Sequence, residues 1–124
     1  MDKYWKKKWV EALRSGEYKQ GKGHLRNEVM DAEDTFCCLG VLCDIIPEVQ
    51  WVRVEEDSNH IQYHIARHED LEDGTVLPRS VASLVGFPDG NPDIMYSFNR
   101  TTLAEENDKG MTFEEIADLI EEQF

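Results

Sequence analysis

Three cysteines lie close together at Cys37, Cys38 and Cys43, and thiols are strong nucleophiles when they ionise. A helix that begins at this point would place Cys37 or Cys38 on its first turn, where the helix dipole lowers the pKa of a thiol. A histidine such as His24 or His64 would then act as the base. The surrounding residues match no known nucleophile motif and contain no C-x-x-C pair. This favours the other interpretation, in which the cysteines are small apolar residues of a buried helix.

The histidines His60, His64 and His68 are spaced four residues apart. On a helix this spacing would stack the imidazoles on one face, and two of them would share a zinc ion. On a strand, successive members lie about 13 Å apart, which is too far for one metal. Apolar and polar residues alternate over 61–65, and this pattern predicts a strand. We therefore expect neither a metal site nor a cofactor.

A glycine-rich stretch over residues 15–26 carries most of the remaining candidate chemistry. Glycines let backbone amides approach an anion, neighbouring cations would hold a phosphate, and a tyrosine is available for stacking. The stretch matches neither a P-loop nor a dinucleotide fingerprint. It is interpreted either as a site for a small anionic ligand such as a nucleotide, or as a solvated loop that offsets the acidic remainder. The candidate ligand-binding residues are Tyr18, Lys19, Lys22, His24 and Arg26.

The chain is strongly acidic, with 26 acidic against 13 basic side chains and a formal net charge of −13. Residues 1–26 hold eight of the basic side chains, whereas residues 27–124 hold 23 carboxylates. This balance argues against direct nucleic-acid binding, which needs clustered lysine and arginine, and against an anionic membrane surface. The carboxylates would suit docking on a basic host protein in place of a nucleic-acid backbone, although charge scattered in this way usually serves solubility alone.

The length of 124 residues allows a single domain over 1–124. Its core is expected at 36–46, a run whose one charged residue is Asp44. An odd number of cysteines, two of them adjacent, indicates reduced thiols in a cytoplasm rather than a disulfide framework. No apolar run is long enough to cross a bilayer, and the first residues carry no secretory signal.

Two helices are expected to build this core. Over 3–14, apolar residues recur at helical spacing while lysines face outward. A second helix is predicted over 36–46. Asp34 or Thr35 would cap its beginning, and Pro47 would end it because proline cannot continue the hydrogen-bond ladder.

Strands are expected after the cysteine helix. A β-hairpin is predicted over about 49–67, with turn-forming residues at 57–59. Further along the chain, Pro78 is predicted to open a short helix. Residues 94–98 are expected to be extended, and 103–107 to form a short helical piece.

The last helix has the clearest signal, because Thr112 and Glu115 form a capping box ahead of an apolar helical face. The predicted fold class is α+β. The N-terminal and central cysteine-containing helices would pack on a small antiparallel sheet, with the C-terminal helices beside them.

Four sequence pieces occur in order and span most of the chain. They are W-x3-W-x2-A-L-R-S-G-x-Y-x-Q at 5–20, C-C-L-G-V-L-C-D at 37–44, L-P-x-x-V at 77–81, and N-D-x-G-x-x-F-x-x-I-A-D-x-I-E at 107–121. As a set they resemble a family of short proteins from tailed phages and prophages. The resemblance implies a phage origin and an infected bacterial cytoplasm. That family has no settled activity, so the resemblance implies no catalytic residues.

These observations favour a non-catalytic phage accessory protein that binds and neutralises a host component, and so acts as a host-defence antagonist. Its partner would be either a small anionic ligand at the glycine-rich stretch or a basic host protein at the acidic surface. The alternative is a cysteine-dependent hydrolase or transferase that uses Cys37 or Cys38. A two-fold homodimer is the default expectation for a small binding protein.

Overall fold

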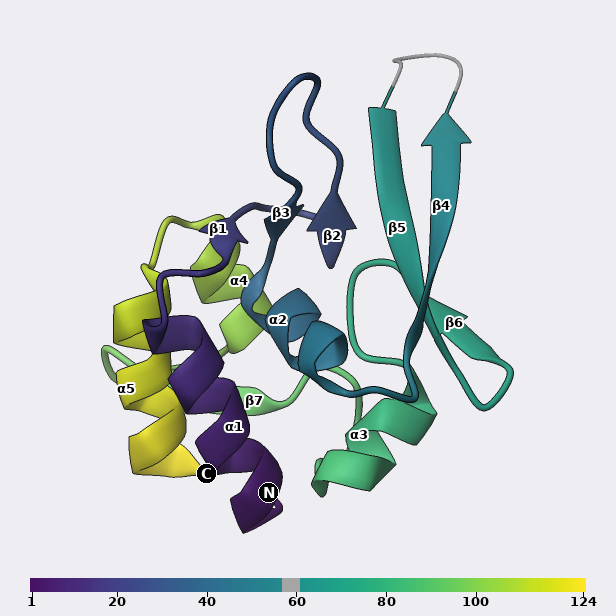
Figure 1. Ribbon diagram of the computed structural model, residues 1–124. Helices are drawn as coiled ribbons and strands as arrows, with labels where there is room; N and C mark the ends of the chain where they lie inside the picture. Colours follow the sequence, from purple (N-terminus) through teal and green to yellow (C-terminus); the bar gives the residue numbers. More distant parts are fainter. Residues whose placement is uncertain (57–60) are drawn as a thin grey trace.

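The computed structural model describes residues 1–56 and 61–124, which form an α+β fold with five helices around a mixed sheet (Figure 1). The predicted fold class is confirmed. The helices are α1 (Lys3–Arg14), α2 (Cys38–Ile45), α3 (Arg79–Val85), α4 (Leu103–Asp108) and α5 (Phe113–Gln123). None of these helices is long and apolar enough to span a membrane.

The main sheet has the strand order β1-β3-β2-β5-β4, and β6 pairs with β5 beside this path. Its strands are β1 (Lys19–Gln20), β2 (Arg26–Asn27), β3 (Thr35–Phe36), β4 (Gln50–Glu56), β5 (Ile61–His68) and β6 (Leu71–Asp73). The predicted sheet was purely antiparallel. The observed one is mixed, because β1 and β3 pair in parallel. The expected hairpin over 49–67 is confirmed as β4 and β5, whereas the predicted turn at 57–59 and His60 lie outside the described residues.

The core is centred on α2, as the apolar run predicted. Six consecutive residues of this helix, from Cys38 to Cys43, are buried. The indole Nε1 of Trp9 on α1 donates to the carbonyl oxygen of Cys38 at 2.9 Å. On the far side of α1, the Arg14 guanidinium pairs with carboxylates on α5, including Asp118 at 2.6 Å. Helix α1 is therefore fastened both to the core helix and to the C-terminal helix.

The beginning of α2 differs from the prediction. Phe36 belongs to strand β3 and not to the helix, and the N-cap is Cys37, which makes no side-chain cap hydrogen bond. Neither Asp34 nor Thr35 caps the helix, because Thr35 and Phe36 pair with β1 on one side and β2 on the other. This two-sided pairing holds the backbone extended up to Cys37, and the helix begins directly after it.

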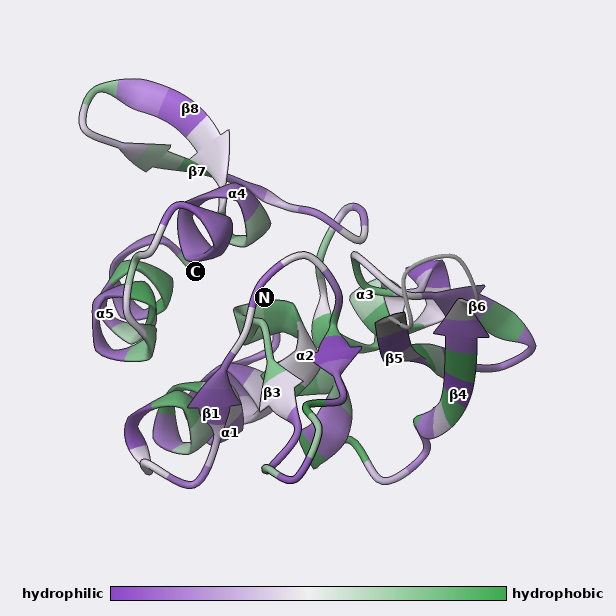
Figure 2. Cartoon of the chain, turned by 90° about the horizontal axis from the view of Figure 1, so that it is seen from above, coloured by the Kyte–Doolittle hydropathy of each residue, from purple (hydrophilic) through white to green (hydrophobic). Residues whose placement is uncertain are grey.

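The C-terminal part of the chain contains a second, two-stranded sheet. It is the hairpin of β7 (Asp93–Tyr96) and β8 (Asn99–Thr102), which projects beside α4 in Figure 2. The segment expected to be extended over 94–98 therefore forms one strand and the turn of this hairpin. The capping box of α5 is confirmed, with the Thr112 hydroxyl oxygen accepting from the backbone of Glu115 and the Glu115 side chain accepting in return.

Candidate functional site

The three cysteines are buried in the centre of the molecule. Cys37 is 3% exposed, and Cys38 and Cys43 are fully covered. Burial raises the pKa of Cys37 to about 11, and it raises the pKa of the other two thiols as well. A nucleophilic cysteine needs a thiolate that a substrate can reach. The geometry therefore favours the packing role of these thiols over the hydrolase or transferase alternative.

Native-state labelling checks this assignment. In folded protein near neutral pH, iodoacetamide is expected to leave all three cysteines unmodified, because they are protonated and covered. After denaturation in guanidinium, all three should react, and intact-mass spectrometry counts the adducts. Rapid modification of one thiol in the folded protein would contradict the packing role and revive the cysteine enzyme.

Two of the five candidate ligand residues have their polar groups engaged inside the protein. The Arg26 guanidinium forms an ion pair with Asp34 at 2.9 Å and lies over the ring of Trp51, 5.5 Å from its centroid. The Tyr18 hydroxyl donates to a carboxylate oxygen of Asp44 at 2.6 Å, and the Trp51 indole donates to the other oxygen at 2.9 Å. Burial, with this hydrogen bond, raises the pKa of Tyr18. Both side chains belong to one network of polar and ring contacts that also includes Asp34, Asp44 and Trp51.

The other three candidate residues do not gather around this network. Lys19 and Lys22 are exposed. The ring of His24 is half-buried and stacks on the Tyr63 ring at 4.0 Å. A phosphate group is best held by several donors that converge on one point. Of the five residues, two thus bind partners within the protein, two are exposed, and one stacks on a neighbouring ring.

A buried amide organises the glycine-rich stretch. Asn107 is fully covered, and its Oδ1 accepts from the Gln20 side chain at 2.8 Å and from the backbone N–H of Cys38 at 3.2 Å. Its Nδ2 donates to the carbonyl oxygen of Gly21 at 2.8 Å. One side chain thus connects β1 and the stretch after it to the first turn of α2.

The predicted strand placement of the histidines holds for the two members that the structure describes. His64 and His68 both lie on β5. His64 Nε2 is 3.0 Å from a carboxylate oxygen of Glu28, and His68 Nδ1 is 2.8 Å from the hydroxyl oxygen of Ser80. Over residues 1–56 and 61–124, no group of three histidine, cysteine or carboxylate side chains is placed to hold a metal ion.

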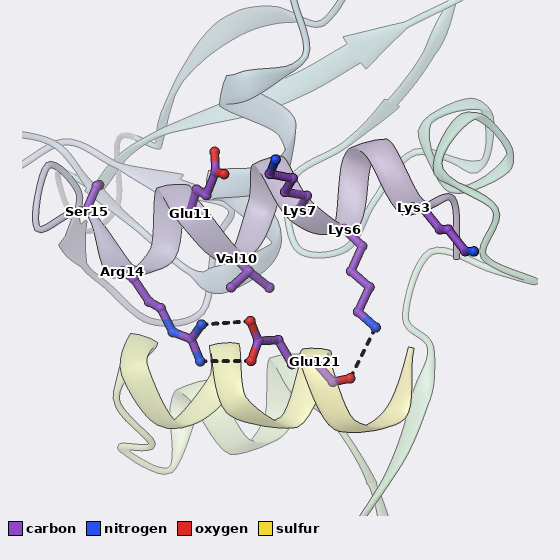
Figure 3. Close-up of a pocket in the computed structure, with 8 residues that line it drawn as sticks. All are labelled: Lys3, Lys6, Lys7, Val10, Glu11, Arg14, Ser15 and Glu121. Carbon is purple, nitrogen blue, oxygen red and sulfur yellow. Dashed lines mark hydrogen bonds and ion pairs between the residues drawn. The ribbon is translucent and has the colours of Figure 1, made fainter.

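A basic groove of about 810 Å³ runs along α1 beside α5 (Figure 3). Two of its cations already have partners on α5: Lys6 Nζ donates to the carbonyl oxygen of Glu121 at 3.1 Å, and Arg14 pairs with the Glu121 carboxylate. In Figure 3, Lys7 points away from α5. The groove therefore lies at the packing interface between α1 and α5, where part of its positive charge is already neutralised. Its lining residues are Lys3, Lys6, Lys7, Val10, Glu11, Arg14, Ser15 and Glu121.

The most unusual exposed feature is the tip of the β7–β8 hairpin. Tyr96 pairs with Asn99, so that Ser97 and Phe98 form a two-residue turn. Both turn residues have positive φ, 52° for Ser97 and 65° for Phe98, and the Phe98 side chain is fully exposed. Asparagine and glycine are the residues favoured in such a turn. An exposed phenylalanine here costs about 1–2 kcal/mol in backbone strain and buries none of its ring.

The hairpin is held firmly against the body of the protein. The Gln123 side chain of α5 donates to the carbonyl oxygen of Met95 at 2.6 Å and accepts from its N–H at 2.8 Å. At the other strand, the Thr101 hydroxyl donates to Glu105 on α4 at 3.0 Å, and this hydrogen bond lowers the pKa of Glu105. The hairpin that carries Phe98 is thus anchored to the body of the protein at both of its strands. In the sequence, the one signal of this feature is the pair Ser97-Phe98, which departs from the usual Asn-Gly chemistry of a two-residue turn.

Neither the curated proteins nor the solved structures contain a match to this chain. A family model, described as a domain of unknown function (DUF8296), matches residues 1–124. Because this match covers the whole sequence, the chain belongs to the DUF8296 family.

Proposed function

We propose that this protein is a non-catalytic phage accessory protein that binds and neutralises a host protein through the tip of the β7–β8 hairpin. The observation that carries the proposal is Phe98, which is fully exposed in a left-handed turn. A position that costs stability and buries no apolar surface is explained if the ring is buried in a partner. In an infected cell such binding would make the protein a host-defence antagonist.

A protein partner accounts for the geometry better than a small anionic ligand does. Two of the five residues of the small-ligand site, Tyr18 and Arg26, have their polar groups engaged with Asp44 and Asp34. The hairpin tip, in contrast, offers three exposed apolar side chains, Met95, Tyr96 and Phe98. Aromatic anchors of this kind fill pockets at protein interfaces and supply much of the binding energy.

The partner that fits is a protein with an apolar pocket on a basic surface. The net charge of −13 attracts such a protein over long range and speeds its encounter. Close to the hairpin, Glu105 is exposed but already pairs with Lys109 at 3.3 Å, so the attraction comes from the net charge of the whole surface and not from this carboxylate. The acidic surface would thus provide attraction, and the Phe98 ring would provide the buried anchor.

A turn-optimising variant tests this proposal. Replacing Ser97→Asn together with Phe98→Gly is expected to raise the free energy of unfolding by about 1–2 kcal/mol, because both residues favour positive φ. The same variant should lose its host partner. The expected pair of results is a higher urea midpoint and an abolished interaction, which no loss of folding can imitate.

Crosslinking identifies the contact directly. A photoreactive phenylalanine at position 98 is expected to give a discrete adduct in bacterial lysate, and the same group at Met30 serves as the control. Met30 is 91% exposed, comparable with Phe98, but lies in a loop before β3. Equal crosslinking at both positions, or a partner retained by the turn-optimised variant, would refute the hairpin as the docking element.

A further inference from the structure

Strand β4 forms an open edge of the main sheet. It pairs with β5 over its full length, and among the described residues no other strand pairs with its second edge. Its sequence QWVRVEE contains neither proline nor lysine, two residues that commonly protect an edge. It does carry Arg53, Glu55 and Glu56, so an incoming strand has to match these charges. A regular edge of this length is a ready template for another strand.

We propose that a second copy of this chain pairs with β4, antiparallel and about a two-fold axis through Val54. The inference is independent of the proposed function, because it uses a different sheet from the β7–β8 hairpin. The charges on β4 are the reason for choosing a second copy of this chain as the strand that pairs with the open edge. In this register Arg53 of each copy lies opposite the partner's Glu55, so that the interface contains two identical ion pairs.

The two-fold axis leaves few registers to choose from. If both copies keep the same face of the sheet on the same side, one residue must lie opposite itself, because side chains alternate between faces. An axis through Arg53 would place two guanidinium groups opposite one another, which destabilises the pair. An axis through Val52 would place Glu55 opposite Val49 of the other copy, so Glu55 would have no cation opposite it. The axis through Val54 is the one that matches charges of opposite sign.

The apolar face of the hairpin supports the same arrangement. Val52 and Val54 lie opposite Ile65 and Tyr63 of β5, and all four side chains are half-buried. On β5 this face is covered by the segment at Gly74, where an added Cβ would be 3.5 Å from both Ile65 and Tyr63. At the edge, among the described residues, the two valines have a neighbouring strand on one side alone. A partner strand would place the two Val54 side chains against each other.

The size of the contact sets the expected strength. One short ladder of strand pairing buries less surface than the roughly 1,200–2,000 Å² of a stable interface. The dimer is therefore expected to be weak, with a dissociation constant of about 10–100 µM. Such a dimer forms at high concentration, and it leaves the hairpin of β7 and β8 free in both copies.

Sedimentation equilibrium with charge-reversed variants tests the register. The wild type is expected to dimerise within the stated range. Glu55→Arg should weaken dimerisation at least tenfold, because Arg53 would then face an arginine. This variant keeps the ion pair of Arg53 with Glu28 at 2.7 Å but loses the longer contact of Arg53 with Glu55 of the same chain at 3.8 Å, so the urea midpoint of the variant is measured as well to check that the monomer folds. The double variant Arg53→Glu with Glu55→Arg is made in a Glu28→Gln background, because a glutamate at position 53 would otherwise lie beside the Glu28 carboxylate that Arg53 pairs with. It should restore the dimer, because the ion pairs between the copies return with their signs exchanged, and Glu28→Gln alone is its control.

Hydrogen exchange supplies a measurement that does not depend on the variants. The amides of β4 that face away from β5 should gain protection as the wild-type concentration rises, while those of β7 and β8 should not. A wild type that stays monomeric at about 500 µM overturns the proposal. So does a folded double variant that remains as dissociated as Glu55→Arg, because the pairing would then not depend on the Val54 register.

Discussion

The Gly40→Ala variant is expected to lose about 3–5 kcal/mol of unfolding free energy, although it adds a single methyl group. A Cβ at this position would lie 1.8 Å from the carbonyl oxygen of Leu25 and 2.7 Å from its carbonyl carbon. The obstacle is backbone and cannot rotate away. It is also fixed, because that carbonyl oxygen accepts from the N–H of Cys37 at 3.2 Å. Helix α2 would have to move away from the segment before β2.

The direction of the stability change in Gly40→Ala distinguishes a close backbone contact from an ordinary helix position. At an open position inside a helix, glycine to alanine stabilises by about 1 kcal/mol, so a large loss reports the close approach. Gly23→Ala is the matched control. It has a φ of 83° and no atom within 4 Å of the added Cβ, so it should cost about 1–2 kcal/mol through strain alone. Urea unfolding followed by tryptophan fluorescence compares the two variants. A smaller loss for Gly40→Ala than for Gly23→Ala would contradict the predicted contact.

The elements that carry a strong local pattern were predictable from the sequence. The eleven residues over 36–46 had to be buried because so few of them are polar, and the helix within them is fully covered from Cys38 to Cys43. The capping box at Thr112 places the start of α5 without any tertiary information. In the same way, alternating residues identify β5 as a strand and separate its histidines from one another.

The features that depend on long-range pairing were not predictable. Phe36 reads as the first residue of an apolar helix, but its backbone pairs with Gln20 of β1 and with Arg26 of β2, and a helical pattern around Phe36 does not show this pairing. Arg26 reads as a free cation among glycines. Its role follows from Asp34 and from Trp51, residues that the fold alone brings beside it. A single sequence shows which groups are available, whereas their partners are set by topology.

The second large effect is expected at Asn107. Replacing it with leucine should cost about 3–4 kcal/mol, because the buried Cys38 N–H and Gly21 carbonyl oxygen would each lose a partner. The shape of leucine is close to that of asparagine, so the cost arises from unsatisfied polar groups more than from a cavity. Asn99→Leu is the control, since this exposed residue makes its one side-chain hydrogen bond to Ser97 and should change stability by less than about 0.5 kcal/mol.

Asn107→Asp turns the same site into a test with a pH dependence. The aspartate oxygen still accepts from Cys38, but an ionised carboxylate cannot donate to the Gly21 carbonyl oxygen. Burial beside Asp108 should raise the pKa of the new carboxyl above its unfolded value of about 3.9. The folded variant then binds more protons than the unfolded chain in this range, so its stability relative to the wild type increases as the pH falls and decreases as the pH rises.

Urea unfolding at several pH values between about 8 and 5 measures this difference. The destabilisation of Asn107→Asp should shrink towards the acid end, because the protonated carboxyl can donate to Gly21 as the amide does. The destabilisation of Asn107→Leu should stay constant over the same range, since no titrating group replaces the amide. Parallel curves for the two variants would show that the Asn107 site is open to water, and that it does not hold the glycine-rich stretch on α2 through buried hydrogen bonds.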